Sequence, residues 1–255
     1  MANASDFLRL HRDPALLRVV NVWDVISAKV VADTPGTRAL ATASHGIAAT
    51  LGYPDGEHIP ADEMLDMCGR IAAAVDLPVT ADLEGGYDDA PGTVRRAIGL
   101  GLVGANIEDQ MKPLADAARQ VERIMAVAGE EGVPDFVLNA RTDTFLRAGD
   151  RAPGDVLADA IERGRAFLDA GAPLVFVPGR LDDEQVAALV NAYGPQRLTL
   201  IGAPGSLPPA RLEELGVARL SFGPHPQRVA LTALQELVES VHAGGGLPDS
   251  MRVLT

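Results

Sequence analysis

Two acidic side chains, Asp82 and Glu84, follow a short apolar run at 78–81 and precede Gly85 and Gly86. This pattern is typical of a buried parallel strand whose carboxyl end carries chemistry. Because residues two apart on a strand share a face, the two carboxylates should point the same way. They repel each other unless a proton or a cation lies between them, and Mg²⁺ suits oxygen ligands of this kind. A solvated acidic turn is the alternative interpretation.

Short apolar runs like this one recur along the whole chain and alternate with segments of helical periodicity. The eight predicted strands are Arg18–Val22, Arg38–Ala43, Val79–Asp82, Gly104–Ile107, Phe136–Ala140, Leu174–Val177, Leu198–Ile201 and Arg219–Ser221. Helical patterns between them include Ala115–Glu131, Gly154–Ala170 and Asp182–Tyr193. Alternating strands and helices imply parallel strands with right-handed crossovers. Eight such units predict an α/β protein with one (β/α)₈ TIM barrel domain over residues 1–255.

In a barrel of this type, functional residues lie at the carboxyl ends of the strands. The polar residues that follow the first five predicted strands are Asn21, Trp23, Asp24, Ser44, His45, Gly46, Asp55, Asp82, Glu84, Asn106, Glu108, Asp109, Asn139, Arg141 and Asp143. The acids therefore gather after strands two to five, with one arginine among them. We expect these side chains to surround a single cavity.

The four acids Asp55, Asp82, Glu84 and Glu108 carry too much negative charge to remain unpaired in a cleft. Mg²⁺ takes one or two carboxylates directly, and the remaining acids can hold its water ligands. Mn²⁺ could take the same place. Such an ion stabilises an enolate that forms on the keto oxygen of a 2-oxo acid. Arg141 is suited to a bidentate bond with a carboxylate.

Several of these residues also have a plain structural interpretation. Asp55 sits in Gly-Tyr-Pro-Asp-Gly, which looks like a turn. Arg141 could pair with Asp143, and His45 could only cap its loop. Trp23 could pack at the mouth of the barrel. The sequence leaves these alternatives open.

Composition excludes some partners. The chain has 255 residues and a net charge of −13, which argues against binding to nucleic acid or to an anionic membrane surface. No signal peptide and no apolar stretch of membrane-spanning length is visible. Cys68 is the only cysteine, so no intrachain disulfide forms, and a cytoplasmic location is expected. Cys68 lies in an amphipathic helical pattern, Ala61–Ile71, which predicts a buried thiol.

Six short motifs occur in an order that resembles the isocitrate lyase/phosphoenolpyruvate mutase superfamily. They are Asn21-Val22-Trp23-Asp24, Ser44-His45-Gly46, Gly52-Tyr53-Pro54-Asp55, Ala81-Asp82-Leu83-Glu84-Gly85-Gly86-Tyr87, Asn106-Ile107-Glu108-Asp109-Gln110 and Asn139-Ala140-Arg141-Thr142-Asp143. The resemblance covers about residues 20–145, and Ser221-Phe222-Gly223-Pro224 also fits it. It implies a Mg²⁺-dependent carbon–carbon lyase that acts on small 2-oxo or 2-hydroxy carboxylates. It also implies a homo-oligomer, a dimer or a tetramer, in which subunits exchange the last helix.

The resemblance also implies roles for single residues. Asp82 matches the direct metal ligand, and Asp55, Glu84 and Glu108 match acids that bind the metal's water molecules. Substrate-binding positions are matched by Trp23, Asp24, Ser44, His45, Gly46, Asn139 and Arg141. Catalytic roles are expected for Arg141 and Glu108, and Tyr87 and Lys112 are nearby candidates for a proton donor.

The loop after the fourth strand departs from the superfamily pattern. Lyases of this superfamily carry a Lys-Lys-Cys-Gly-His loop there, whereas Gln110–Ala115 contains no cysteine and runs almost directly into a helix. The sixth strand ends in Val177-Pro178-Gly179, without the histidine of phosphonate-handling members. Oxaloacetate-like decarboxylation or carbon–carbon cleavage is therefore the expected reaction. The alternatives are a 2-oxo acid-binding barrel with little catalysis, a transferase like ketopantoate hydroxymethyltransferase, and phosphonate P–C bond chemistry.

Overall fold

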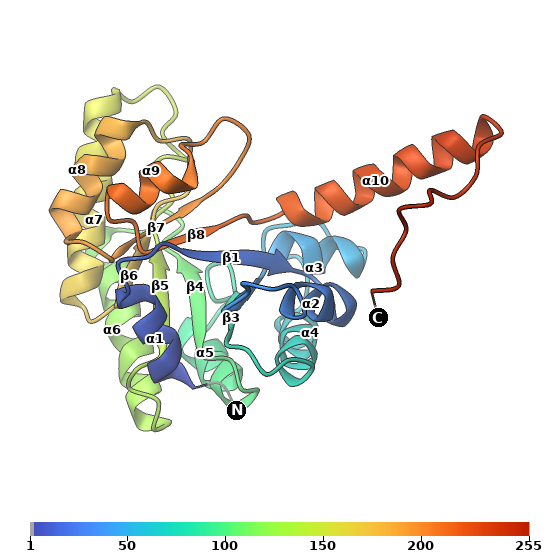
Figure 1. Cartoon of the computed structure of the whole chain (residues 1–255). Coiled ribbons are helices and arrows are strands. Elements are labelled where there is room, and N and C mark those ends of the chain that lie inside the picture. Colours follow the sequence, from blue (N-terminus) through green and yellow to red (C-terminus); the bar gives the residue numbers. More distant parts are fainter. Residues whose placement is uncertain (1–2, 255) are drawn as a thin grey trace.

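A computed structural model describes residues 3–254, and it contains a closed barrel of eight parallel strands in the order β1 to β8, with β1 paired to β8 (Figure 1). The strands are β1 (Leu17–Val22), β2 (Leu40–Thr42), β3 (Val79–Asp82), β4 (Gly104–Glu108), β5 (Val137–Arg141), β6 (Leu174–Phe176), β7 (Leu198–Ile201) and β8 (Arg219–Ser221). The predicted (β/α)₈ barrel is confirmed, and all eight strands lie where the apolar runs indicate them.

The helices lie between the strands, with one extra helix before β1. They are α1 (Ala4–Arg12), α2 (Val25–Ala32), α3 (Ser44–Thr50), α4 (Ala61–Ala73), α5 (Ala90–Gly99), α6 (Leu114–Glu130), α7 (Pro153–Asp169), α8 (Asp183–Tyr193), α9 (Pro209–Glu214) and α10 (His225–His242). The local sequence explains where two of these helices begin. Asp24 caps α2 and Asp182 caps α8, each through a reciprocal capping box.

Two strands extend further than the apolar pattern indicates. β4 includes Glu108 and β5 includes Arg141, because these two residues are register partners and their side chains form an ion pair of 2.8 Å. β2 is shorter than predicted and consists of three buried residues. An ion pair between neighbouring strands can therefore extend the strands beyond the apolar runs from which they are predicted.

The interior of the barrel contains a polar network as well as aliphatic side chains. Asn139 donates to Asn106 at 2.8 Å, and Thr199 donates to Asn139 at 2.7 Å. Arg219 is fully buried and donates from Nη2 to the same Asn106 oxygen at 3.1 Å. Burial lowers the pKa of Arg219 to about 10, and the charge of Asp82 opposes this shift. A cation is thus held inside the barrel close to the acidic end of β3.

Helix α1 lies against the amino-terminal ends of the strands and closes that end of the barrel. Phe7 is fully buried there, and the His11 ring packs edge-on against it with centroids 4.5 Å apart. His11 is also fully buried, and its Nδ1 donates to the Phe7 carbonyl oxygen at 2.8 Å. Burial and the nearby Arg219 charge lower the pKa of His11 to about 3.

The lowered pKa of His11 predicts a loss of stability in acid. The unfolded chain binds a proton at this side chain below about pH 6.5 while the folded chain does not, so stability falls as the pH drops toward 3. Between pH 7 and pH 5 this single group should remove about 2 kcal/mol from the free energy of unfolding. Urea denaturation at both pH values should show a clearly smaller loss in His11→Gln. An equal loss in both proteins would contradict the assignment.

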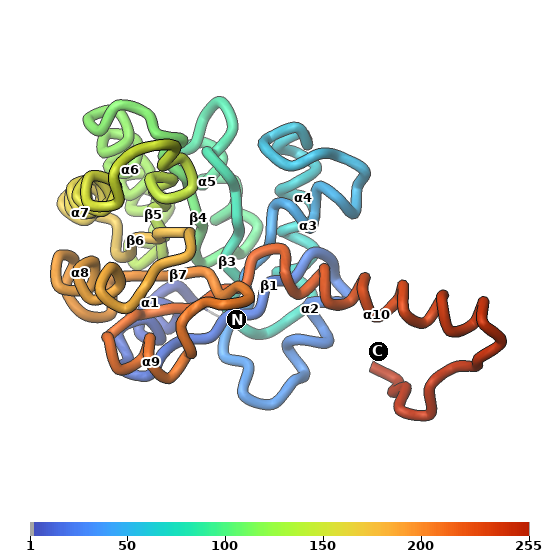
Figure 2. The backbone as a smooth tube through the Cα atoms, turned by 90° about the horizontal axis from the view of Figure 1, so that it is seen from above, coloured from blue at the N-terminus to red at the C-terminus, as the bar shows by residue number. Residues whose placement is uncertain are grey.

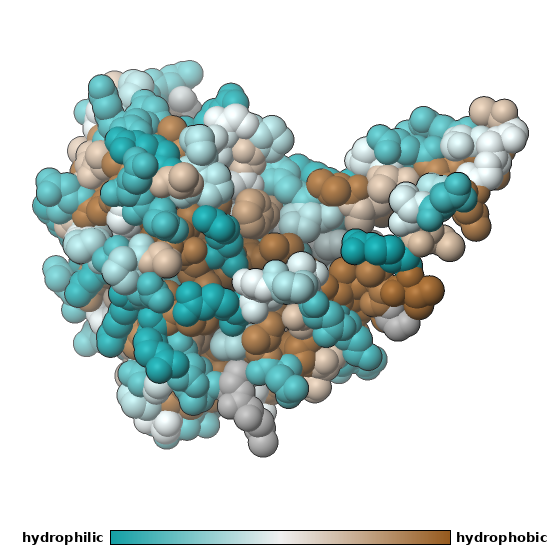
Figure 3. Space-filling view, in the orientation of Figure 1, coloured by the Kyte–Doolittle hydropathy of each residue, from teal (hydrophilic) through white to brown (hydrophobic). Residues whose placement is uncertain are grey.

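Helix α10 projects away from the barrel, and a segment without helix or strand follows it (Figure 2). Apolar residues appear on the surface of this arm in Figure 3. Leu231, Leu234, Val238 and Val241 are between 44% and 55% exposed and recur at helical spacing on one face. Of all the residues of α10, only Gln227 is buried. The predicted exchange of this helix between subunits stays a prediction.

The remaining composition-based expectations concern Cys68 and the membrane. Cys68 is fully buried in α4, and burial raises the pKa of its thiol to about 12, so the predicted buried thiol is confirmed. Among the helices of residues 3–254, none combines the length and the apolar character that a membrane span requires.

Candidate active site

A cavity of about 520 Å³ opens at the carboxyl ends of the strands. Its wall and floor include residues from the ends or following loops of β1 to β3 and β5 to β8, together with Asn106 of β4. Of the polar residues predicted from sequence, those that line it are Asn21, Ser44, His45, Asp55, Asp82, Asn106 and Arg141. This cavity brings together about half of the predicted set, and the other predicted residues lie outside its lining.

Asp82, the last residue of β3, is the acid most firmly placed in this cavity. Its Oδ2 accepts hydrogen bonds from the Ser44 hydroxyl at 2.8 Å and from the Ser44 backbone N–H at 3.2 Å. Its own N–H donates to Thr42 Oγ1 at 3.0 Å. Ser44 is the first residue of α3, so the start of that helix fixes one oxygen of Asp82. The other oxygen, Oδ1, makes no hydrogen bond within residues 3–254.

Glu84 lies beyond the end of β3 and does not line the cavity. Its backbone has φ of +54°, so the alternation of the strand does not continue to it. The side chain is buried, one oxygen accepts from the Glu57 N–H, and Oε1 has no hydrogen-bond partner. Burial, and then the charge of Asp82, raise the pKa of Glu84 to about 8. The expected repulsion between these two acids is therefore present.

Arg141 is held between two carboxylates on the wall of the cavity. Nη1 lies 2.8 Å from Glu108 and Nε lies 2.7 Å from Asp143. Burial raises the pKa of Glu108 to about 7, although the Arg141 charge opposes this. The pairing with Asp143 noted as a structural alternative is present, and Arg141 lines the cavity as well. Its guanidinium is thereby fixed in orientation, and its Nη2 makes no hydrogen bond or ion pair within residues 3–254.

Asp55 and His45 face each other across the rim of the cavity. His45 Nδ1 lies 3.5 Å from Asp55 Oδ2, and both side chains are partly exposed. Gly46, by contrast, lies outside the lining. A Cβ there would come within 3.0 Å of Trp23 Cβ and 3.3 Å of Gln227 Oε1, so glycine allows α3 to pack closely against these neighbours.

The other predicted residues take different positions. Trp23 and Asp24 border a separate groove beside α2, and Asp24 serves as the cap of that helix. Asn139 is fully buried in the barrel network. The Tyr87 hydroxyl is buried without a partner, and Lys112 donates to Gln120 at 3.3 Å. These five side chains do not line the cavity.

The chain fits a Mg²⁺ ion that keeps most of its waters. Within residues 3–254 no three His, Cys, Asp or Glu side chains converge as a ready metal cage. Asp82 nevertheless lines the cavity, and within the described residues neither its Oδ1 nor the buried Glu84 Oε1 has a hydrogen-bond partner. Burial is the main cause of the raised pKa values of Glu84 and Glu108, and the charge of Asp82 adds to both shifts. One direct carboxylate with water-binding acids around it is a common arrangement for Mg²⁺.

The loops around these acids adopt strained backbone conformations. Left-handed φ values of +49° to +60° occur at Glu57, Glu84, Tyr87, Gln110 and Met111. Each such conformation of a non-glycine residue costs roughly 1 kcal/mol or more, and such residues cluster at functional sites. Side-chain bonds hold the loops in place, since Glu57 accepts from the Tyr87 N–H at 2.6 Å and from Gln110 at 3.2 Å.

The loop after β4 is short, as the sequence predicts, because α6 begins at Leu114. The carboxylate of Asp109 holds this loop in place. Its Oδ1 accepts from the N–H groups of Met111 and Asp143, and its Oδ2 pairs with Arg163 at 3.1 Å. A long mobile segment is therefore absent between β4 and α6.

Sequence reasoning missed the basic side chains that the later strands bring to the cavity. Arg180 follows β6, and His225 and Arg228 belong to the first turn of α10. The Arg180 side chain donates to the Pro204 carbonyl oxygen at 3.3 Å. The only feature of the sequence that could have indicated these residues is that they follow the sixth and the eighth predicted strands. Glu57 was also missed, because nothing local marks it as a loop anchor.

Comparison with known proteins identifies relatives over most of the chain. The family model "Phosphoenolpyruvate phosphomutase" matches residues 7–242. The structure of a candidate phosphonomutase from Burkholderia cenocepacia J2315 has a TM-score of 0.86 and 37% identity, covering 92% of this chain and 97% of that one. An oxaloacetate decarboxylase of Rhodopseudomonas palustris is 32% identical over 70% of this chain and 63% of its own length. The 2-methylisocitrate lyase of Escherichia coli is 32% identical over 58% of this chain and 52% of its own length.

Proposed function

This chain belongs to the phosphoenolpyruvate phosphomutase family, within the isocitrate lyase/phosphoenolpyruvate mutase superfamily. From that premise we propose that it is a Mg²⁺-dependent lyase or hydrolase of a small 2-oxo or 2-hydroxy carboxylic acid. The observation that carries the proposal is the placement of Asp82 and a fixed Arg141 on the same cavity. A carboxylate for the metal and a guanidinium for the substrate are the two groups that such chemistry needs.

Each residue then has a defined task. Asp82 would hold the ion directly, while Asp55, Glu84 and Glu108 would hold its waters. Bound Mg²⁺ would polarise the keto oxygen of the substrate and stabilise an enolate. Arg141 would bind the substrate carboxylate through its free Nη2, and Ser44 keeps Asp82 in position.

The substrate that suits this cavity best resembles oxaloacetate. Arg180 and Arg228 provide positive charge on the wall that lacks acids, which favours a substrate with a second anionic group. The short loop after β4 brings no cysteine, so the reaction would need none there. Decarboxylation meets this condition because water can supply the later proton. The positions of Tyr87 and Lys112 outside the cavity give no support to a donor role for them.

The test is a panel of small acids assayed with purified protein in the presence of Mg²⁺, and again after treatment with a chelator. We expect oxaloacetate or a close 2-oxo dicarboxylate to be turned over only with the metal. Calorimetry on the same panel separates an enzyme from a barrel that only binds. Tight binding without turnover of any acid would reject the lyase.

Phosphonate chemistry is a second candidate, favoured by the 37% identity with the Burkholderia cenocepacia candidate phosphonomutase. Phosphonopyruvate therefore belongs in the same panel, with phosphate or phosphoenolpyruvate followed by ³¹P NMR. Turnover of phosphonopyruvate faster than of oxaloacetate would replace the first candidate by this one.

We also propose that a second copy of this chain covers the apolar face of α10, as the expected homo-oligomer requires. Leu231, Leu234, Val238 and Val241 form a stripe that is costly to leave in water. Replacing Leu231 and Leu234 by Glu should shift the protein toward monomer in sedimentation or light scattering. The matched control is Thr232→Glu, which adds a charge on the opposite, polar face of the same helix. A wild-type protein that is monomeric at high concentration would reject the proposal.

A further inference from the structure

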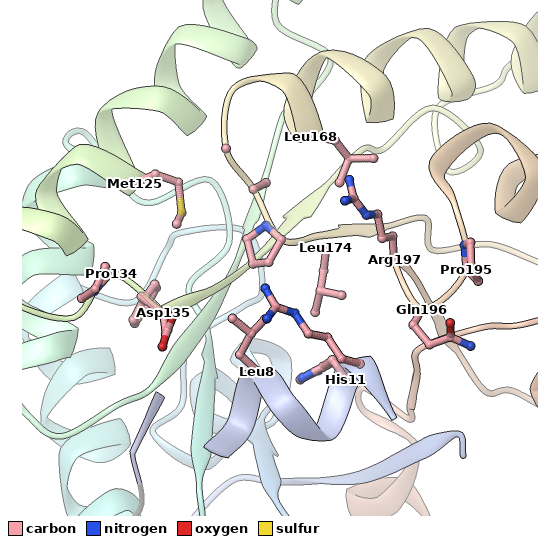
Figure 4. A pocket seen from close by; sticks show the side chains of 15 residues that line it. Leu8, His11, Met125, Pro134, Asp135, Leu168, Leu174, Pro195, Gln196 and Arg197 are labelled. Atoms are coloured by element: carbon pink, nitrogen blue, oxygen red, sulfur yellow. The ribbon is translucent and has the colours of Figure 1, made fainter. Parts of the chain in front are cut away.

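A second cavity, of about 490 Å³, lies at the opposite end of the barrel from the candidate active site. Four segments at the amino-terminal ends of the strands form most of it, Met125 of α6 and Leu168 of α7 complete the lining, and Figure 4 shows these side chains. The four segments are helix α1 and the loops that precede β5, β6 and β7. The volume lies in the range of small-molecule sites. None of the residues proposed for catalysis reaches this cavity.

Two guanidinium groups from separate walls line the cavity. Arg12 comes from the last turn of α1. Arg197 comes from the loop before β7 (Figure 4). Neither side chain forms an ion pair or a hydrogen bond with another residue of the described range 3–254. Both side chains are exposed at the cavity, so their guanidinium groups can meet a ligand that enters from solvent.

The acids near this cavity already have partners. Asp135 is the only acidic residue of the lining, and its carboxylate accepts a hydrogen bond from Ser5 on α1. Asp13, next to Arg12 in sequence, lies 3.7 Å from Arg38 instead. Within residues 3–254 no carboxylate forms an ion pair with Arg12 or Arg197, although Asp135 keeps its charge in the lining.

His11 also lines the cavity, and it is neutral because burial and the charge of the buried Arg219 lower its pKa to about 3. The loop before β7 is also strained, since Gln196 on the lining has φ of +56°. It is the only left-handed non-glycine residue of the described chain outside the loops of the candidate active site.

We propose that this cavity binds a small dianion, either a phosphate monoester or a dicarboxylate, between Arg12 and Arg197. Guanidinium groups bind both kinds of oxyanion through paired charge-assisted hydrogen bonds. Because the two arginines belong to α1 and to the barrel, the bound anion joins the amino-terminal helix to the strands that it closes. The proposal does not depend on the reaction at the other end of the barrel.

Isothermal titration calorimetry without Mg²⁺ tests the site with inorganic phosphate and with malonate as separate probes. Saturable binding of either probe is expected, and the tighter of the two identifies the phosphoryl or the dicarboxylate class. Arg12→Gln and Arg197→Gln should each weaken binding by about tenfold or more, since each removes charge-assisted hydrogen bonds. Arg12→Lys, which keeps the charge, should retain part of the affinity.

Arg9→Gln is the matched control, because Arg9 lies in the same last turn but pairs with Asp6 at 2.7 Å and does not line the cavity. Its affinity should equal that of the wild type. An equal loss in Arg9→Gln would show unspecific attraction and overturn the site. Binding that disappears in Arg180→Gln but persists in Arg12→Gln would place the anion at the active-site mouth and also overturn it. Absence of binding of both probes at millimolar concentration would do the same.

Discussion

Replacing Asp82 by Ala should abolish both Mg²⁺ binding and turnover of 2-oxo acids, with a fall in kcat/KM of roughly a thousandfold or more. Asp82 is the only acid that lies at a strand end, lines the cavity and has one oxygen fixed by Ser44. Burial is the main cause of the raised pKa of Glu84 and the Asp82 charge adds to it, so the variant also removes an unfavourable charge interaction. Calorimetric titration of Mg²⁺ and a steady-state assay measure the two effects.

The control for this variant is Asp88→Ala, which removes an exposed acid from the same loop after β3, outside the cavity. It should bind Mg²⁺ and turn over substrate as the wild type does. If Asp82→Ala retained normal turnover, the metal assignment at β3 would be wrong, whatever the result for the other acids.

Replacing Arg141 by Gln should lower kcat/KM by roughly a hundredfold to a thousandfold. The guanidinium does two things at once, because it is anchored by Glu108 and Asp143 and still faces the cavity. Glutamine has neither the charge nor the reach for both. Arg141→Lys should recover only part of the activity, since one ammonium cannot reproduce the planar fork. Steady-state kinetics over a range of substrate concentrations show whether KM or kcat carries the loss.

Arg147→Gln is the matched control for Arg141. Arg147 approaches the same Asp143 at 3.7 Å but from the exposed side, and it does not line the cavity. Its loss should leave kcat/KM within a factor of about two, because exposed ion pairs contribute little. Equal losses in the two variants would mean that Arg141 acts only through the position of Asp143.

Asp82 and Glu84 show which features of the site a local sequence pattern can predict. The sequence places Asp82 at a strand end because the strand is a short apolar run, and the structure agrees. It places Glu84 on the same face by strict alternation, but the chain turns after Asp82 and buries Glu84 against Glu57. Side chains alternate between the two faces only while the strand pairs with its neighbours. The packing of the following loop decides where that pairing ends.

What the sequence by itself determined is the barrel, the order of its strands and the acids and arginine at the ends of β2 to β5. Those features are encoded locally, in apolar runs, helical periodicity and turn residues. Only the tertiary structure decided which side chains share a cavity, that Arg141 is clamped between Glu108 and Asp143, and that Arg180 and Arg228 complete the wall. It alone revealed Arg12 and Arg197 on one cavity, although 185 positions separate them in the chain. Partners so distant in sequence meet only when the barrel closes, because no local pattern records which loops will lie side by side.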